Sequence, residues 1–251
     1  NIGSVDFGSF FPNNSIILKT DADLSDLPFL SPYITDLDSA AGNYKIKLNI
    51  EGPINNLKRD GSILIQNGIF YTQLLNDPIR FINGEALLTN NKLTIENFSA
   101  GIALDEGNSL KEKFSNTQLK GEVKLNSFFE PDYDLELISK NASFKLLFLD
   151  IYGKTDLDLS IFGKDTVYIE GKIEPDDVNV FYEFSTEDIG TAIVKDQVTT
   201  MSYKLNIPLR NRAFFQNSQI DAEITGELNL SQTGYQEVDF GGQIIVEDGS
   251  A

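Results

Sequence analysis

Closely spaced carboxylates are the residues of this chain that come nearest to a catalytic arrangement. Asp132, Asp134 and Glu136 form one group, and Asp156 and Asp158 form another. A pair of carboxyl groups is what a glycosidase uses as acid and as base or nucleophile. Within an alternating segment, however, a spacing of two residues puts the members of a group on one strand face, opposite the apolar residues. We therefore interpret both groups as solvated surface and expect no enzyme.

The other motifs with a chemical meaning are incomplete. Gly153-Lys154-Thr155 lacks the leading glycine of a phosphate-binding loop, because Phe148 stands at that position. The segment from Asp21 to Asp26 lacks the glycine and the distant glutamate of a calcium loop. The chain contains no histidine and no cysteine, which excludes disulfides, thiol chemistry and triads that need His. We expect neither a metal site nor a cofactor.

Composition limits the class of protein further. The 251 residues carry a formal net charge of -18 and are 41% hydrophobic. Such a charge repels nucleic acid, so a nucleic-acid partner is not expected. An apolar run of about 18 residues is missing, so no transmembrane helix is predicted in this segment. The chain starts at Asn1 without a methionine and ends in a strand-like phrase, and we interpret it as a piece of a longer protein.

The elements that position these side chains are strands with one apolar face. Tyr44, Ile46, Leu48 and Ile50 alternate with polar residues and run into Gly52, and similar phrases recur along the chain. Alternation with period two predicts half-buried strands, and a glycine within them indicates a bend, a bulge or a close backbone approach. We expect roughly 12 to 15 short strands and few or no helices.

Turn and loop residues between these strands suggest how the chain is organised. Asn90 and Asn91 predict the tip of a hairpin. Loops, or short helical turns, are expected at 21–32, 106–117 and 186–200. We divide the chain into an N-terminal segment of strand and loop at 1–43 and a repetitive β domain at 44–251. The β domain has similar sub-units at about 44–118, 119–184 and 201–251.

A sheet with one apolar face must bury that face against something. No helix layer is predicted, so the candidates are a second sheet, the same sheet folded over, or a ligand. Open sheets of more than about ten strands generally curl. We therefore predict an all-β fold made of one long, curled antiparallel sheet, an open groove or β-taco with an apolar inner face. A two-layer β-sandwich with a packed core is the alternative.

The order of several short phrases carries a family resemblance. The phrases are Ile50-Glu51-Gly52, Gly61 to Gly68, Ile82 to Ala86, Asn91 to Phe98, Leu147 to Ile151, Asp158 to Gly163 and Gly241 to Gly249. In this order they resemble the TamB and AsmA-like proteins (translocation and assembly module) of bacteria with two membranes, over about Leu24 to Ala251. One departure is that Pro53 follows Gly52 directly, whereas the family often has a proline just before the next glycine-led strand.

The resemblance implies a periplasmic β-taco protein, anchored to the inner membrane by a helix outside this segment. It also implies a role in outer-membrane biogenesis. The partners would be phospholipid or another acyl-chain lipid, in transit between the membranes, and an outer-membrane insertase-type β-barrel. Hydrophobic segments of outer-membrane proteins are a further cargo of the same kind.

The apolar positions of the alternating strands are the candidate lining of the groove. A uniform aliphatic lining suits sliding of acyl chains, because it offers few polar contacts that would hold them in one place. The competing function is a carbohydrate-binding or adhesin-type β-sandwich, in which aromatic residues stack on sugars. The groove residues are Ile46, Leu48, Ile50, Ile63, Ile65, Leu93, Ile95, Leu157, Leu159, Ile161, Leu205, Ile207, Ile224, Leu228, Ile244 and Val246.

Overall fold

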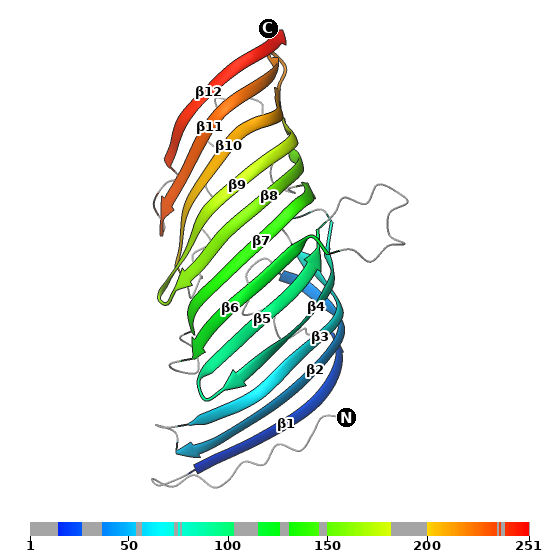
Figure 1. Cartoon of the computed structure of the whole chain (residues 1–251), viewed down its shortest axis with the longest axis vertical. Coiled ribbons are helices and arrows are strands. Elements are labelled where there is room, and N and C mark those ends of the chain that lie inside the picture. The colour runs from blue at the N-terminus through cyan, green and yellow to red at the C-terminus, as the bar shows by residue number, and fades with distance from the viewer. Residues whose placement is uncertain are drawn as a thin grey trace.

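The protein is a single curled β-sheet (Figure 1). The computed structural model describes residues 15–26, 37–53, 57–72, 75, 77–102, 115–125, 131–145, 150–181, 200–234, 236 and 239–250. Within these ranges there are strands, turns and bends but no helix. The prediction of an all-β fold with one long, curled and open sheet is confirmed, and the predicted antiparallel pairing holds for all neighbours but one pair.

Twelve strands follow one another in space in the order in which they occur in the sequence. Every neighbouring pair is antiparallel except β9 and β10, which run parallel. The first and last strands each pair on one side only, so the sheet is not closed. The strands are β1 (Ser15–Asp26), β2 (Leu37–Pro53), β3 (Lys58–Thr72), β4 (Ile79–Thr89), β5 (Lys92–Gly101), β6 (Thr117–Leu125), β7 (Pro131–Lys145), β8 (Asp150–Gly163), β9 (Thr166–Phe181), β10 (Thr200–Gln216), β11 (Asp221–Thr233) and β12 (Asp239–Ser250).

The strands are longer than the sequence pattern predicted. Their lengths run from 9 residues in β6 to 17 in β2 and β10, so the expectation of short strands was wrong. Residues 21–26, expected as a loop, continue strand β1, and β2 begins at Leu37 rather than near Tyr44. The hairpin at Asn90 and Asn91 is confirmed between β4 and β5. The loops expected at 106–117 and 186–200 lie outside the described residues, apart from 115–117 and Thr200.

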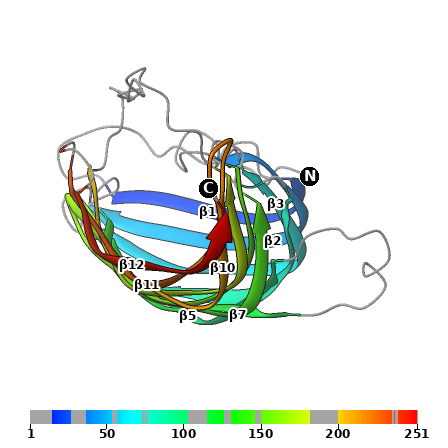
Figure 2. The same cartoon turned by 90° about the horizontal axis from the view of Figure 1, so that it is seen from above.

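The two faces of the sheet differ in polarity. Tyr44 lies opposite Ile65 and Ile46 opposite Ile63, while Lys45 and Lys47 point to the other side. We call these sides the apolar face and the polar face. No second layer of strands or helices covers either face within the described residues. Because strongly buried side chains in one layer need curvature to bring them together, we infer that the apolar face is the concave one (Figure 2).

Bulges and glycines bend the sheet. The register shifts between Ala41 and Asn43 on β2 and between Ile65 and Gly68 on the neighbouring strand β3. It shifts again between Ser139 and Ala142 on β7. Bulges strengthen local twist and bend a strand, and together with glycine kinks they curve a sheet. Gly121 has a φ of +131°, and a Cβ there would lie 2.2 Å from the carbonyl oxygen of Asp134. Close approach between β6 and β7 therefore requires a glycine at this position.

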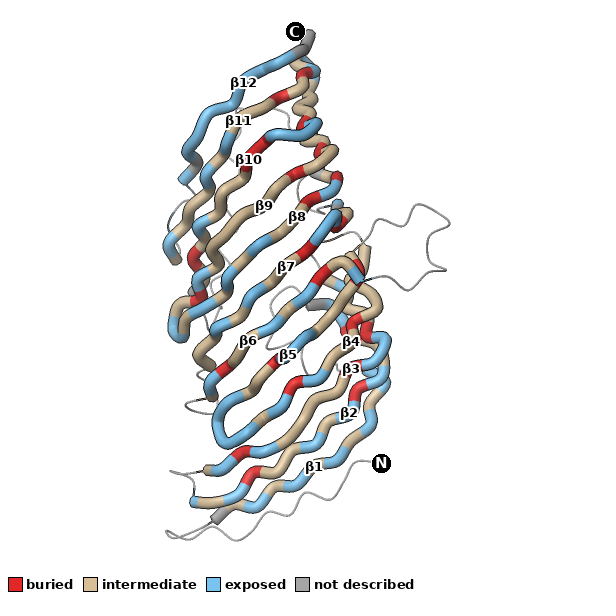
Figure 3. Tube along the Cα trace, in the orientation of Figure 1, coloured by how far each residue is buried: buried red, intermediate tan, exposed pale blue. Residues whose placement is uncertain are grey.

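The shape leaves much of the chain in contact with solvent. Its accessible surface is 16532 Å², about one and a half times the roughly 11,000 Å² expected of a compact monomer of 27.9 kDa. Figure 3 shows buried residues on strands from β2 to β11 but none on the described part of β12. The described residues thus form a single layer, not the two-layer sandwich of the alternative prediction.

Candidate functional site: the apolar face of the sheet

The register brings the predicted groove residues together on one face. Leu137 of β7, for example, lies opposite Leu159 of β8, which lies opposite Gly171 of β9, and Gly171 lies opposite Leu205 of β10. The same chain of pairings connects the predicted positions on β2, β3, β5, β11 and β12 to this face. Bulges shift the register elsewhere along the strands, as between Ile65 and Gly68, so they do not move the predicted positions to the other face.

Burial divides these residues into three groups. Ile50, Ile65, Ile95 and Ile224 are buried, with exposed fractions of 3–8%. At the other extreme, Ile244 and Val246 on β12 are 48% and 60% exposed. The remaining predicted residues are half-buried: Ile46, Leu48, Ile63, Leu93, Leu157, Leu159, Ile161, Leu205, Ile207 and Leu228. Most of the predicted lining is therefore only partly covered by the protein's own atoms.

The N-terminal part of the apolar face has a closed cluster around an aromatic residue. Tyr44 is 1% exposed and packs with Ala40, Ile65 and Ile82. Its hydroxyl donates a hydrogen bond of 2.8 Å to the carbonyl oxygen of Ala41, and burial raises the pKa of the phenol. Sequence reasoning assigned Tyr44 to this face but missed it as a core residue, although a tyrosine in phase with isoleucines is a usable signal.

A second cluster of buried apolar side chains lies near the C-terminal end of the sheet. Leu209 and Ala213 of β10 pack with Ala222 and Ile224 of β11. Half-buried neighbours such as Phe215 and Leu228 extend the cluster along the same strands. The two clusters are separated in the sheet by β6 to β9. The apolar face therefore has a buried apolar cluster towards each end.

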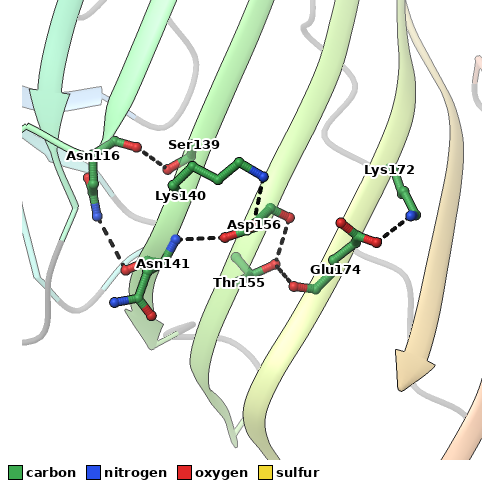
Figure 4. A network of polar contacts seen from close by, with 8 residues as sticks. All are labelled: Asn116, Ser139, Lys140, Asn141, Thr155, Asp156, Lys172 and Glu174. Atoms are coloured by element: carbon green, nitrogen blue, oxygen red, sulfur yellow. Dashed lines mark hydrogen bonds and ion pairs between the residues drawn. The ribbon is translucent and has the colours of Figure 1, made fainter. Parts of the chain in front are cut away.

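Hydroxyl groups occupy the bend in that middle section (Figure 4). Thr117 and Ser139 lie opposite each other on the apolar face, with exposed fractions of 5% and 0%. Their hydroxyl oxygens are 2.7 Å apart, and Ser139 also donates to the carbonyl oxygen of Asn116 at 3.1 Å. On β8, the hydroxyl of Thr155 donates to the carbonyl oxygen of Glu174 at 3.1 Å. Buried polar groups of this kind need partners, and these have them.

Arg59 is the buried cation at one rim of the apolar face. It lies opposite Ile50 and is 8% exposed. Its Nη1 donates to the carbonyl oxygen of Leu125 at 2.7 Å and to Asn91 Oδ1 at 3.2 Å. The Leu125 amide in turn donates to the carbonyl oxygen of Asn91 at 2.6 Å. Arg59 thus connects β3 to the β4–β5 turn and to the end of β6.

Ion pairs cover the polar face. Lys120 lies 2.7 Å from Glu136, and Lys140 lies 2.7 Å from Asp156. The hydrogen bond from Lys140, together with one from the Asn141 amide, lowers the pKa of Asp156. On β9, the hydrogen bond from Lys172 lowers the pKa of Glu174, which lies opposite Asp156 of β8. These contacts involve cross-strand or same-strand partners on a solvated face.

The carboxylates considered for catalysis also lie on the polar face. Asp132 is opposite Lys124, Asp134 opposite Glu122, and Asp158 opposite Lys172. The two groups therefore point away from the apolar face and lie on a surface with alternating charge. Within the described ranges, His, Cys, Asp and Glu form no group of three that could hold a metal ion.

Comparison with protein-family models, with curated proteins and with solved structures finds no match to this chain. Among the residues that the structure describes, no helix has the length and apolar character needed to cross a membrane.

Proposed function

We propose that the apolar face binds hydrocarbon, and that its guest is the acyl chains of a phospholipid or a similar lipid. The observation that supports this most directly is the long row of half-buried aliphatic side chains on a sheet that has no second layer in its described part. A contiguous apolar surface that is only partly covered often marks a site of interaction. A guest chain would supply the missing layer.

The free energies fit a site along which a lipid can slide. Burial of one CH₂ group is worth about 0.8 kcal/mol, so a tail of about 16 carbons would lose roughly 12 kcal/mol on entering water. Leu159, Leu205 and their aliphatic neighbours recover most of this wherever the tail lies. Because no position on such a surface is much better than the next, a tail can move along it at nearly constant free energy.

Strands β7 and β8 in the middle of the sheet offer one position at which the lipid could bind. On β2 to β5, Tyr44, Ile65 and Ile95 are already buried by their neighbours. On β7 and β8, by contrast, Leu137, Leu159 and Ile161 remain half-buried. These half-buried side chains on β7 and β8 are part of the surface that a guest can cover.

The cellular role follows from the family resemblance, and we propose it on that basis. It is transit of lipid, or of hydrophobic outer-membrane protein segments, through the periplasm, with the protein anchored to the inner membrane by a helix outside this segment. An outer-membrane insertase-type β-barrel is the proposed partner. The charge of -18 is compatible with a protein that does not adhere to anionic head groups.

Photo-crosslinking tests the proposal directly. A benzophenone amino acid at position 159 or 205 is expected to crosslink to lipid tails when the protein is mixed with phosphatidylethanolamine vesicles. Position 158, which is exposed on the polar face of the same strand, is the control and should give little product. Equal yields at 158 and 159 would contradict binding at the apolar face.

A charged substitution provides the complementary test. Leu159→Asp should abolish lipid that co-purifies with the protein and is extracted by organic solvent, while the far-ultraviolet circular dichroism stays that of a β protein. A half-buried side chain on an open face tolerates a charge better than a packed core does. If Leu159→Asp binds as much lipid as the unmodified protein, the proposal is wrong.

Carbohydrate binding is the second candidate, and one feature favours it. Phe162 and Tyr168 stack across the β8–β9 hairpin with ring centroids 5.4 Å apart, on the polar face, and remain 37% and 40% exposed. Exposed rings of this kind can stack on sugars. Binding to a glycan array that is lost in Tyr168→Ala but kept in Leu159→Asp would favour this function over lipid transfer.

A further inference from the structure

Two asparagines of this chain are each followed by glycine, and both lie where the pairing of strands is irregular. Asn67-Gly68 lies at a shift in the pairing of β3 with β4, and Asn83-Gly84 lies at shifts in the pairing of β4 with β5. Both β3 and β4 have a neighbouring strand on each side. An asparagine before glycine is chemically labile, because glycine has no side chain that would obstruct attack by its nitrogen on the neighbouring amide.

Asn67 is held loosely at its bulge. Pairing with β2 passes from Gln66 to Ile69, and pairing with β4 passes from Ile65 to Gly68, so Asn67 has no partner in either ladder. Its φ is 53°, and the residue is exposed. Among the residues that the structure describes, none makes a hydrogen bond to its side-chain amide. The amide is therefore free to turn towards the backbone nitrogen of Gly68.

Asn83 is held in place by its side chain. Its Oδ1 accepts a hydrogen bond from the Asn67 backbone amide at 2.9 Å, and its Nδ2 donates one to the carbonyl oxygen of Phe81 at 2.7 Å. The residue is also half-buried. Reaction at Asn83 requires that both hydrogen bonds break first, which happens only in a minor, locally open state. The structure thus distinguishes two identical dipeptides by the hydrogen bonds of their side chains.

We propose that Asn67 is a site of spontaneous deamidation, at which the folded protein slowly converts asparagine to aspartate and isoaspartate. The backbone nitrogen of Gly68 loses its proton to base and attacks Cγ of Asn67. The new N–Cγ bond closes a succinimide ring as the Cγ–Nδ2 bond breaks, and the side-chain nitrogen takes up a proton and leaves as ammonia. Water then opens the ring. Hydrolysis of the N–Cγ bond gives aspartate, whereas hydrolysis between the nitrogen and the Asn67 carbonyl carbon gives isoaspartate, in which the main chain continues through Cγ.

The two products differ in their effect on the bulge. Aspartate keeps the backbone as it is and adds a charge at an exposed position. Isoaspartate lengthens the main chain of β3 by one atom directly before Gly68, which is buried. There is little room for this change, since a Cβ on Gly68 would lie 2.9 Å from Ile65 Cγ2 and 3.1 Å from Ile82 Cβ. Both isoleucines pack with Tyr44, so isoaspartate, and not aspartate, should loosen this cluster.

Incubation of the unmodified chain tests the proposal with an internal control. The folded protein is kept in mildly alkaline buffer, and cleavage after Arg59, Arg80 and Lys92 then places the two asparagines on separate peptides. Mass spectrometry should show deamidation at Asn67 at least about tenfold faster than at Asn83. In concentrated urea the two rates should be similar, because the hydrogen bonds of Asn83 are lost. Equal rates in the folded protein, faster reaction at Asn83, or reaction of Asn67 in urea alone would overturn the proposal.

Two variants separate the products by their effect on stability. Asn67→Gly removes the reactive amide and suits a positive φ, and Asn67→Asp reproduces the aspartate product without incubation. After incubation, the unmodified protein should contain an isoaspartate fraction, identified by electron-transfer fragmentation, that pulse proteolysis digests at a lower urea concentration. Incubated Asn67→Gly should be digested like fresh Asn67→Gly, and fresh Asn67→Asp like the fresh unmodified protein. An equal loss of stability in incubated Asn67→Gly would place the damage elsewhere, and a loss in fresh Asn67→Asp would show that charge alone loosens the cluster. Either result would overturn the role given to isoaspartate at this bulge.

Discussion

The sheet bends in a similar way at two bulges that are completed by different chemistry. Asn67 on β3 and Asn141 on β7 both have a positive φ, 53° and 50°, and both lie at shifts in the ladder. In each case a side chain on the next strand accepts the amide hydrogen: Asn83 Oδ1 at 2.9 Å and Asp156 Oδ1 at 2.7 Å. A neutral amide thus completes the first bend and a carboxylate the second.

The apolar side of the two bends differs even more. Near the first, Tyr44 packs with Ile65 and Ile82, and all three are buried. Near the second, Thr117 and Ser139 occupy the bend with their own hydrogen bonds, and the leucines beside them stay half-buried. The residues at the two bends thus differ in size and polarity: a tyrosine lies at the first, and a threonine and a serine lie at the second.

The largest effect is expected from removal of the aromatic filler. Tyr44→Ala should destabilise the protein by about 3–5 kcal/mol, because a fully buried ring is replaced by a cavity. Urea denaturation followed by circular dichroism measures it. Tyr71→Ala is the control, since Tyr71 lies on the same hairpin and is 43% exposed. A loss for Tyr44→Ala no greater than for Tyr71→Ala would show that the first bend does not depend on its filler.

A smaller effect is expected where a glycine permits close approach in the middle section. Gly121→Ala should cost about 1–3 kcal/mol, because the residue has a positive φ and the new Cβ would contact the backbone of Asp134. Gly241→Ala is the control, with no atom within 4 Å of a Cβ. The same denaturation experiment applies, and equal stability of the two variants would contradict the role given to Gly121 in the bend.

Alternation was sufficient to predict the fold class and the face of each candidate residue. The positions of Leu159 and Leu205, far apart in sequence, share a face because alternation in each strand follows the same rule. A curled open sheet then followed from the number of one-sided strands and the lack of helical periodicity. These properties depend on local patterns, which a sequence displays.

Strand lengths and the bend could not be predicted in the same way, because bulges interrupt the alternation. Residues 37–43 belong to β2, but the shift at Gly42 breaks the pattern, so the strand seemed to begin at Tyr44. Ser139 lies on the apolar face opposite Thr117, but as a polar residue it does not continue the aliphatic alternation of Leu135 and Leu137. The parallel pairing of β9 with β10 was also missed, since orientation depends on the path of the chain and not on the residues of either strand.

Removal of the Ser139 hydroxyl should reduce the stability of the protein modestly, and the size of the loss should depend on whether Thr117 is present. Ser139→Ala should cost about 1 kcal/mol, because Thr117 loses its 2.7 Å partner in a buried site. Replacement of both residues, as Thr117→Val with Ser139→Ala, should cost less than the sum of the two single changes. A double-mutant cycle in urea gives the coupling. Strictly additive costs would mean that the two hydroxyls do not act together.

The smallest expected effect is a difference between the two bends in how their contribution to stability depends on pH. The pKa of Asp156 is lowered by the hydrogen bonds from Lys140 and Asn141, so its carboxylate stabilises the fold above the ordinary pKa of 3.8. That contribution is lost as the pH falls through the lower value in the folded protein. Asp156→Asn should therefore lower the melting temperature at neutral pH, and the gap to the unmodified protein should close in acid. Asn83→Ala removes the matching acceptor at the first bend, where no charge is involved, and its gap should be independent of pH. The same pH dependence in both variants would show that the carboxylate gives the second bend no titratable stability of its own.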